Sequence, residues 1–474
     1  MDKTLPGVGA AILIGIALRF VCNLDPVWWL AWCVPGLLLA LSLRFEGWTS
    51  RGLIVLAAAI GVSVNFGYLR SVMPLPPVLI ILTLQTLAWL LVVGASRRIV
   101  LAFRSGWTVL ALPVLSVALD TALANFTPDG NFGSLGYTQA DVLPIAQLAS
   151  VLGVGGILFV VLTINSALAL ALHSRLELPN AKFAYTAVVA LFVGTAGFGW
   201  WRLQTPSAGK EVTFGIASID DYINDPVGEK AIEIWAQYDA QVAALAGAGA
   251  RIVLLPEKID VLSAKGAEFR QRRLGQLAAN NKVWLVAGLG VDREGLKRNE
   301  AWWYQPDGQL ATNYLKHYMA PPEREFVPGD EYPTNEIDGV RYGVAICKDM
   351  HFASLGRGFG ARGAAVMLVP AWDFKKDQFY AMNMTKLRGI ESGFAIVRAS
   401  RDGLLTATDA YGRVLDAAES TSMPGTTLLT KAKVGVRVST IYLRIGDALG
   451  WLCLVAAALM FGAAFRMKRK GSDQ

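Results

Sequence analysis

Long apolar segments fill roughly the first 200 residues of the chain and occur once more near its end. A helix that crosses a bilayer needs about 20 consecutive, mostly apolar residues. Apolar segments of about this length occur near residues 5–22, 28–43, 52–69, 76–95, 107–125, 145–172, 182–201 and 446–465. This pattern predicts about eight transmembrane helices, seven of them before a long polar region and one after it.

The polar region alternates between short strand-like runs and amphipathic helical stretches. Runs such as EVTFGIAS, RIVLLPE and KVWLVAGLG read as strands, and helical patterns lie between them near 228–247 and 265–280. Apolar strands separated by amphipathic helices are typical of an α/β fold. Turn signals at QPDG (305–308) and AYGR (410–413) indicate hairpins, so we expect a mixed sheet covered by helices.

These patterns divide the chain into three parts. Residues 1–206 are expected to form an N-terminal membrane domain with about seven transmembrane helices, and residues 207–440 the α/β domain. Residues 441–474 add the last transmembrane helix and a basic tail. A polar region of about 230 residues is long enough to bury a full hydrophobic core of its own.

The composition and the distribution of charge favour a membrane protein. Hydrophobic residues make up 54% of the chain and charged residues 17%, whereas a soluble protein carries about 25% charged residues. The formal net charge is +7, but residues 207–440 contain 28 Lys and Arg against 28 Asp and Glu. The basic surplus therefore lies beside the apolar segments, which argues against nucleic-acid binding. The four cysteines are too few for a disulfide-stabilised secreted scaffold.

The positions of Lys and Arg predict the orientation, because short cytoplasmic loops carry an excess of both residues. With the N-terminus in the cytoplasm, the basic residues on that side are Lys3, Arg44, Arg51, Arg97, Arg98, Arg104, Arg175, Lys182, Arg466, Lys468, Arg469 and Lys470. The short loops on the other side carry only Arg70. We therefore expect both termini in the cytoplasm and the polar region outside it.

Three polar residues stand out because each follows an apolar, strand-like run. Glu257 ends RIVLLPE, Cys347 ends VRYGVAIC, and Lys316 follows the predicted strands near 301–315. Sites in α/β folds are built at the ends of strands. Taken singly, a free cysteine is often a small hydrophobic residue, and Glu257 and Lys316 could each be a surface or ion-pair residue.

Taken together, these three residues could supply a nucleophile, a base and a cation for one reaction. A cysteine attacks as its thiolate, so a base must take its proton, and a carboxylate such as Glu257 can do so. Attack on a carbonyl creates an oxyanion, which the ammonium of Lys316 can stabilise. The product is an acyl-thioester on Cys347. The chain has three His and no metal-ligand spacing, so we predict neither a metal site nor a cofactor.

The blocks around these residues resemble a known family. LLPEK, YLKHYMAPPEREFVPG and GVAICKDMHF match, in order and spacing, the Glu-Lys-Cys triad of the nitrilase superfamily of carbon-nitrogen hydrolases. The segment LRGIESGFAIVRASRDGLLTATDAYGRVL (387–415) is similar to a further block of that superfamily. The resemblance implies an αββα sandwich for the polar region, with Glu257, Lys316 and Cys347 as the catalytic residues.

The membrane half narrows the resemblance to one branch, the apolipoprotein N-acyltransferases. SLGYTQADVLPIAQLASVLGVGGILFVVLTINSAL (134–168), PVWWLAWCVPGLLLAL and TIYLRIGDALGW (440–451) resemble blocks of that branch. The resemblance implies a multi-pass enzyme of the bacterial inner membrane with a periplasmic catalytic domain. It implies transfer of an acyl chain from a phospholipid, typically phosphatidylethanolamine, to the N-terminal diacylglyceryl-cysteine of a lipoprotein.

Four further residues are supporting candidates. Glu325 in EREFVP is similar to the family's second glutamate, which implies that it holds Lys316 or supports the thioester site. Glu391 is expected either near the site or in an ion pair with Arg388. The family usually has Cys-Tyr-Glu at the nucleophile, but this chain has Lys348 and Asp349 after its cysteine. Lys348 could lower the pKa of the thiol, bind an anionic group, or face solvent.

Other functions remain compatible with the sequence. The Cys-Lys-Asp segment leaves the true amine acceptor open. A membrane-tethered amidase would use the same triad with water in place of the amine. A catalytically silent membrane scaffold is a third alternative, against which the complete Glu-Lys-Cys set argues. The acyl chain length and the oligomeric state cannot be read from the residues.

Overall fold

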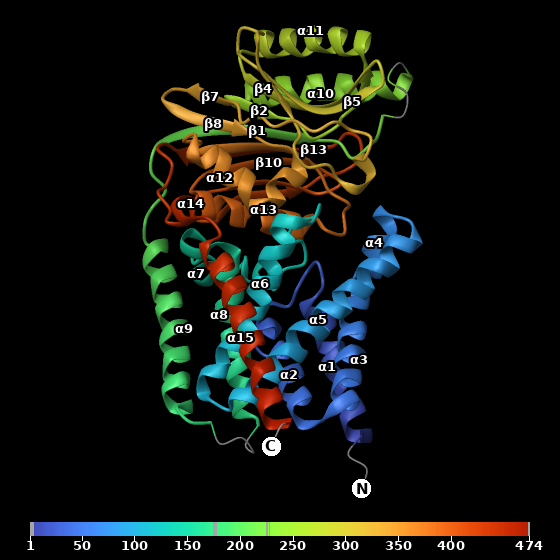
Figure 1. The fold of residues 1–474 in the computed structure, drawn as a ribbon. Coiled ribbons are helices and arrows are strands. Elements are labelled where there is room, and N and C mark those ends of the chain that lie inside the picture. Colours follow the sequence, from blue (N-terminus) through green and yellow to red (C-terminus); the bar gives the residue numbers. More distant parts are fainter. Residues whose placement is uncertain (1–3, 174–177, 224–225, 227, 473–474) are drawn as a thin grey trace. The chain divides into compact units, whose positions relative to one another are not determined.

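The computed structural model describes residues 4–173, 178–223, 226 and 228–472, shown in Figure 1. Lys3 and Arg175, which entered the prediction of orientation, lie outside these residues. The chain divides into one compact unit formed by Met1–Gln204 and Ile445–Gln474, and another formed by Thr205–Arg444.

The first unit is helical. Its α-helices are α1 (Thr4–Val21), α2 (Val34–Arg44), α3 (Gly47–Val62), α4 (Phe66–Val72), α5 (Leu75–Phe103), α6 (Ala111–Phe126), α7 (Leu143–Ala146), α8 (Ala149–Ala171), α9 (Ala181–Leu203) and α15 (Ala448–Ser472). One buried polar side chain in this unit links separate segments of the chain. The Asn165 amide on α8 donates to the Ala31 carbonyl over 2.8 Å and accepts from the Gly36 backbone N–H over 2.7 Å.

The number of helices that can cross a membrane is smaller than expected. Within the described part of the chain, five helical segments are long and apolar enough, namely Gly47–Val72, Leu75–Phe103, Gly106–Phe126, Ala149–Ala171 and Ala181–Leu203. Three others, Leu5–Val21, Trp28–Arg44 and Ala448–Ala464, are apolar but have only 10–17 residues. Ala448–Ala464 is the apolar part of the longer helix α15. By these criteria of length and composition, five segments qualify in the described part of the chain, fewer than the about eight that the sequence predicts.

The second unit contains a pair of mixed sheets. The first has the strand order β13-β1-β2-β4-β5-β6, with β3 also paired to β4, and the second has the order β12-β11-β10-β9-β8-β7. The first sheet consists of β1 (Lys210–Ser218), β2 (Ile252–Leu254), β3 (Val261–Ser263), β4 (Trp284–Arg293), β5 (Leu296–Tyr304), β6 (Leu310–Leu315) and β13 (Thr426–Val434). The second consists of β7 (Thr334–Ile337), β8 (Val340–Val344), β9 (Val366–Trp372), β10 (Ala395–Arg401), β11 (Leu404–Thr408) and β12 (Val414–Glu419).

Helices cover the outer faces of the two sheets (Figure 1). They are α10 (Glu229–Gly247) and α11 (Ala264–Asn281) on the first sheet, and α12 (Ala353–Ala361) and α13 (Gln378–Ser392) on the second; the short α14 (Tyr442–Ile445) ends the unit. Between the sheets, Val286 and Trp303 pack in one buried cluster with Val344 and Leu368. This α-β-β-α arrangement is the nitrilase-like sandwich that the sequence predicts.

Central strands are buried on both faces because a helix covers one face and the other sheet covers the opposite one. Every residue of β2 is buried, and β9 is buried except at its last residue. This explains why these strands appear in the sequence as continuous apolar runs rather than as alternating patterns. Polar side chains that follow such strands lie at the edge of the core.

Candidate active site

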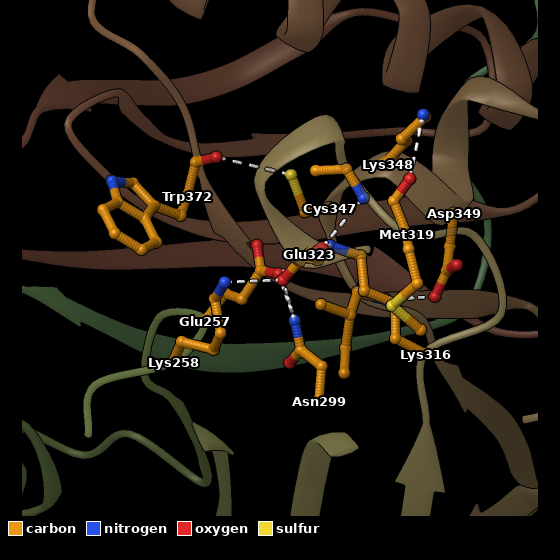
Figure 2. Close-up of polar contacts among 12 residues, drawn as sticks. Glu257, Lys258, Asn299, Lys316, Met319, Glu323, Cys347, Lys348, Asp349 and Trp372 are labelled. Carbon is orange, nitrogen blue, oxygen red and sulfur yellow. Dashed lines mark hydrogen bonds and ion pairs between the residues drawn. The ribbon is translucent and has the colours of Figure 1, made fainter. Parts of the chain in front are cut away.

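The three expected catalytic residues lie where strands end. Glu257 follows β2, Lys316 follows β6, and Cys347 begins the short 3-10 helix η6 (Cys347–His351) after β8. The first two side chains are buried, with exposed fractions of 2% and 1%. The side chains lie together in the close-up of Figure 2, although Lys316 comes from the first sheet and Cys347 from the second.

Lys316 joins two buried carboxylates. Its Nζ donates to Oε1 of Glu257 over 2.7 Å and to Oε2 of Glu323 over 2.7 Å. Burial alone would lower the pKa of Lys316, but the charges of Glu257 and Glu323 act more strongly in sum and hold this pKa well above its usual range. The side chain is therefore an ammonium, as stabilisation of an oxyanion requires.

Glu323 and Asn299 complete the network of hydrogen bonds. Glu323 ends the short 3-10 helix η5 (Pro321–Glu323), and the Asn299 Nδ2 on β5 donates to Glu257 over 2.6 Å and to Glu323 over 2.7 Å. Lys258 Nζ lies 2.6 Å from Glu323 Oε1. Burial would raise the pKa of Glu323, but Lys316 and Lys258 together lower it far below its usual range.

Cys347 has an unusual backbone conformation for a non-glycine residue. Its φ of +45° lies in the left-handed region, which costs a residue with a side chain on the order of 1–2 kcal/mol. Such strain clusters at functional sites, where the surrounding structure enforces it. Here it places the thiol at the sharp turn between β8 and η6, and the Sγ–H donates to the Trp372 carbonyl over 3.4 Å.

Cys347 is protonated at neutral pH. Burial raises the pKa of its thiol well above the usual range, and the nearby Glu257 carboxylate raises it further, while the Lys316 ammonium lowers it. A thiol in this state has to lose its proton before it can attack, and Glu257 is the carboxylate that acts most strongly on Cys347.

Asp349 connects the nucleophile to the loop of Lys316. Its Oδ2 accepts from the Ile346 backbone N–H over 3.0 Å and from the Tyr314 hydroxyl over 2.7 Å. Its Oδ1 accepts from the backbone N–H groups of His317 and Tyr318 over 3.0 Å and 2.9 Å. Burial raises the pKa of Asp349, and the Lys316 ammonium and these donors lower it. Both oxygens are engaged, so Asp349 positions the site.

Lys348 is buried rather than facing solvent, with 6% of the residue exposed. Its Nζ donates to the Met319 carbonyl over 3.0 Å. The sequence left open whether Lys348 lowers the pKa of the Cys347 thiol; burial has the largest effect on this pKa and raises it.

The expected contact between Glu325 and Lys316 is not formed. Glu325 is exposed and pairs with Lys297 at the surface, with 2.6 Å between Nζ and Oε2. Glu323 holds Lys316 instead, because η5 turns the Glu323 side chain inward.

Glu391 on α13 forms a buried ion pair with Arg388, with 2.7 Å between Oε2 and Nη1. The sequence left open whether Glu391 lies near the site or pairs with Arg388, and the structure shows the ion pair.

Sequence reasoning missed Lys258, Asn299 and Glu323. A buried asparagine in β5 and a lysine directly after Glu257 carry no local pattern that marks them. Glu323 lies two residues before Glu325 in EREF, and the resemblance pointed to Glu325 instead. Among the described residues, no group of three or more His, Cys, Asp or Glu side chains is arranged to hold a metal ion.

Comparisons with known proteins give matches for both the N-terminal membrane part and the polar region of the chain. A family model for the N-terminal domain of apolipoprotein N-acyltransferase matches residues 15–167, and a carbon-nitrogen hydrolase model matches residues 219–423. The chain is 25% identical to an apolipoprotein N-acyltransferase of Geobacter metallireducens, over 76% of this chain and 75% of the relative. It is 24% identical to apolipoprotein N-acyltransferase 1 of Treponema pallidum, over 71% of this chain and 72% of the relative.

A crystal structure of an amidase from Nesterenkonia sp. is also similar. It is 20% identical and gives a TM-score of 0.42 over 52% of this chain and 96% of the amidase.

Proposed function

Because the chain belongs to the apolipoprotein N-acyltransferases, a membrane branch of the carbon-nitrogen hydrolases, we propose that Cys347, Glu257 and Lys316 move an acyl chain from a phospholipid to an amine. The protein is a bacterial membrane enzyme of the acyltransferase class. The proposal concerns the acyl donor, the amine acceptor and the roles of the three residues.

In the first step, Glu257 takes the proton of the Cys347 thiol while the sulfur attacks an ester carbonyl of the phospholipid. The Lys316 ammonium stabilises the oxyanion that forms. When the tetrahedral intermediate collapses, the ester C–O bond breaks. The lysophospholipid oxygen leaves with the proton that Glu257 held, and the acyl chain remains on the sulfur as a thioester.

In the second step, an amine attacks the thioester carbonyl. Glu257 takes a proton from the amine nitrogen, the C–S bond breaks, and the sulfur leaves and regains the proton that Glu257 holds. The product is an amide. The relatives' name supports the N-terminal amine of a lipoprotein as the acceptor. The burial of Glu257 and Lys316 also favours an amine over water, because a site shielded from water limits hydrolysis of the thioester.

The orientation belongs to the same proposal. The excess of Lys and Arg in alternate short loops supports cytoplasmic termini and a catalytic unit in the periplasm. There the catalytic unit is anchored at the bilayer surface, where phospholipid esters have a high effective concentration.

The observation that carries the proposal is the Lys316 ammonium held between two buried carboxylates beside Cys347. The test is intact-mass spectrometry of detergent-purified enzyme after incubation with phosphatidylethanolamine. We expect the mass of one fatty acyl group to be added to the wild type and not to Cys347→Ala. A synthetic diacylglyceryl-cysteine peptide should then remove the adduct and become acylated.

Other outcomes would favour the alternatives. Release of free fatty acid without an acylated peptide would favour a hydrolase, as would turnover of simple amides. Acylation of another amine, but not of the peptide, would change the acceptor and keep the first step. An adduct that persists in Cys347→Ala would remove Cys347 from the mechanism.

A further inference from the structure

Lys258 directly follows Glu257 and lies inside the site. Its backbone φ of +44° is in the left-handed region, and only 11% of its side chain is exposed. The ammonium lies 2.6 Å from Glu323 Oε1 and faces the rings of Phe326 and Trp372, with 5.1 Å and 5.2 Å to their centroids. Figure 2 shows Lys258 on the side of Glu257 away from Lys348.

The balance of buried charges in the site explains why the position of the Lys258 ammonium matters. Two buried carboxylates, Glu257 and Glu323, share the single ammonium of Lys316. Two buried negative charges against one positive charge favour protonation of a carboxylate. A protonated Glu257 cannot take the proton of the thiol. The second ammonium, on Lys258, makes the numbers of positive and negative charges equal.

Other charged groups also act on the residues of the site. The variants that test Lys258 leave these groups unchanged, so their contribution to the charge balance stays the same. Asp373 and Arg398 form a buried ion pair, and both act on Cys347. Arg401 on β10 acts on Glu257, and Asp349 acts on Lys316. None of these groups takes over the contact that Lys258 makes with Glu323.

We propose that Lys258 is a positioning residue of the acyl transfer, whose ammonium neutralises Glu323 so that Lys316 remains shared with Glu257. This inference rests on the proposed function and deepens it. Lys258 acts through Glu323 and Lys316 and does not touch the reacting atoms.

The experiment measures the rate of Cys347 acylation by phosphatidylethanolamine as a function of pH in wild type, Lys258→Met and Lys258→Arg. In Lys258→Met, we expect the acidic limb of the profile to move to higher pH by about one unit, because the two buried carboxylates then share only one positive charge. The rate should fall about tenfold at acidic pH and recover as the pH rises. Lys258→Arg keeps the charge and should restore the acidic limb.

Lys297→Met is the matched control, because it removes the ammonium of an exposed Lys-Glu pair with the same 2.6 Å distance. We expect its profile to overlay that of wild type. The double variant Lys258→Met/Glu323→Gln removes one charge of each sign and should return the acidic limb toward wild type, although the rate at the plateau falls. A structural role for Lys258 predicts further damage in the double variant instead.

Three results would overturn the inference. They are an acidic limb in Lys258→Met that matches wild type, a uniform loss of rate at every pH, and no return in the double variant. If Lys258→Met does not fold, Lys258→Arg and the double variant decide the matter. If wild type forms no acyl adduct, the proposed function fails, and the same variants are compared by the pH dependence of Cys347 alkylation with iodoacetamide.

Discussion

Lys316 and Glu323 form a buried ion pair, with 2.7 Å between Nζ and Oε2 and about 2% or less of either side chain exposed. Glu323 comes from a short 3-10 turn, and Lys316 follows a strand of the first sheet. Because the Lys316 ammonium also donates to Glu257 over 2.7 Å, its position is set by two buried carboxylates.

Replacing Glu323 is predicted to be far more damaging than replacing Glu325. Glu323→Gln breaks a buried pair, which typically costs about 3–5 kcal/mol, and should lower the melting temperature and the acylation rate. Glu325→Gln removes an exposed pair that contributes about 0–1 kcal/mol and should leave both unchanged. Thermal unfolding in detergent and the intact-mass assay check the prediction. Equal effects of the two substitutions would contradict the assignment of the inner carboxylate.

The strained backbone at Cys347 predicts a difference between two inactive variants. A glycine accepts a φ of +45° without cost, whereas alanine retains the clash of its Cβ. Cys347→Gly should therefore be more stable than Cys347→Ala by about 1 kcal/mol, although both lose the nucleophile. Unfolding of the two variants in the same detergent measures the difference. A less stable glycine variant would mean that the turn is relaxed in solution.

Asp349→Asn should lower the acylation rate with little change in the apparent KM. The amide nitrogen of asparagine cannot accept, so at least one of the backbone or hydroxyl donors around Asp349 is left unpaired, at a cost of about 1–3 kcal/mol. The turn that carries Cys347 then loosens relative to Lys316. Asp338→Asn, at an exposed carboxylate, is the control. A pure KM effect in Asp349→Asn would place this residue in substrate binding instead.

The raised pKa of Cys347 predicts slow reaction with small alkylating reagents at neutral pH. Only the thiolate reacts, and burial keeps the thiol protonated until the pH exceeds its usual range. The rate of iodoacetamide labelling should therefore keep rising at pH values where a free cysteine has reached its plateau. A chain with Cys22, Cys33 and Cys453 replaced by alanine isolates the signal. A plateau near neutral pH would show that the ammonium of Lys316 outweighs burial.

Strand ends made much of the site predictable from the sequence. Glu257, Lys316 and Cys347 follow apolar runs, and the alternation of strands and helices indicates the sandwich. The choice between Glu323 and Glu325 was not predictable, because residues two apart lie on the same side of an extended chain. Only the turn at Pro321–Glu323 separates them. Lys258 and Asn299 enter the site through tertiary contacts, which leave no local pattern.

The number of membrane helices depends on how long an apolar helix must be to be counted. The sequence predicts about eight spans, and five described segments meet the criteria of length and composition. Leu5–Val21, Trp28–Arg44 and Ala448–Ala464 are shorter apolar helical segments, the last of them within the longer helix α15.

The hydrogen bond from Cys347 to the Trp372 carbonyl has a consequence for how the resting enzyme withstands oxidation. Oxidants attack thiolates, and sulfenic acid formation follows thiolate character and access. A neutral S–H directed at a backbone oxygen is a poor target for hydrogen peroxide. The proposed nucleophile is therefore protected from oxidation as long as this hydrogen bond holds its proton.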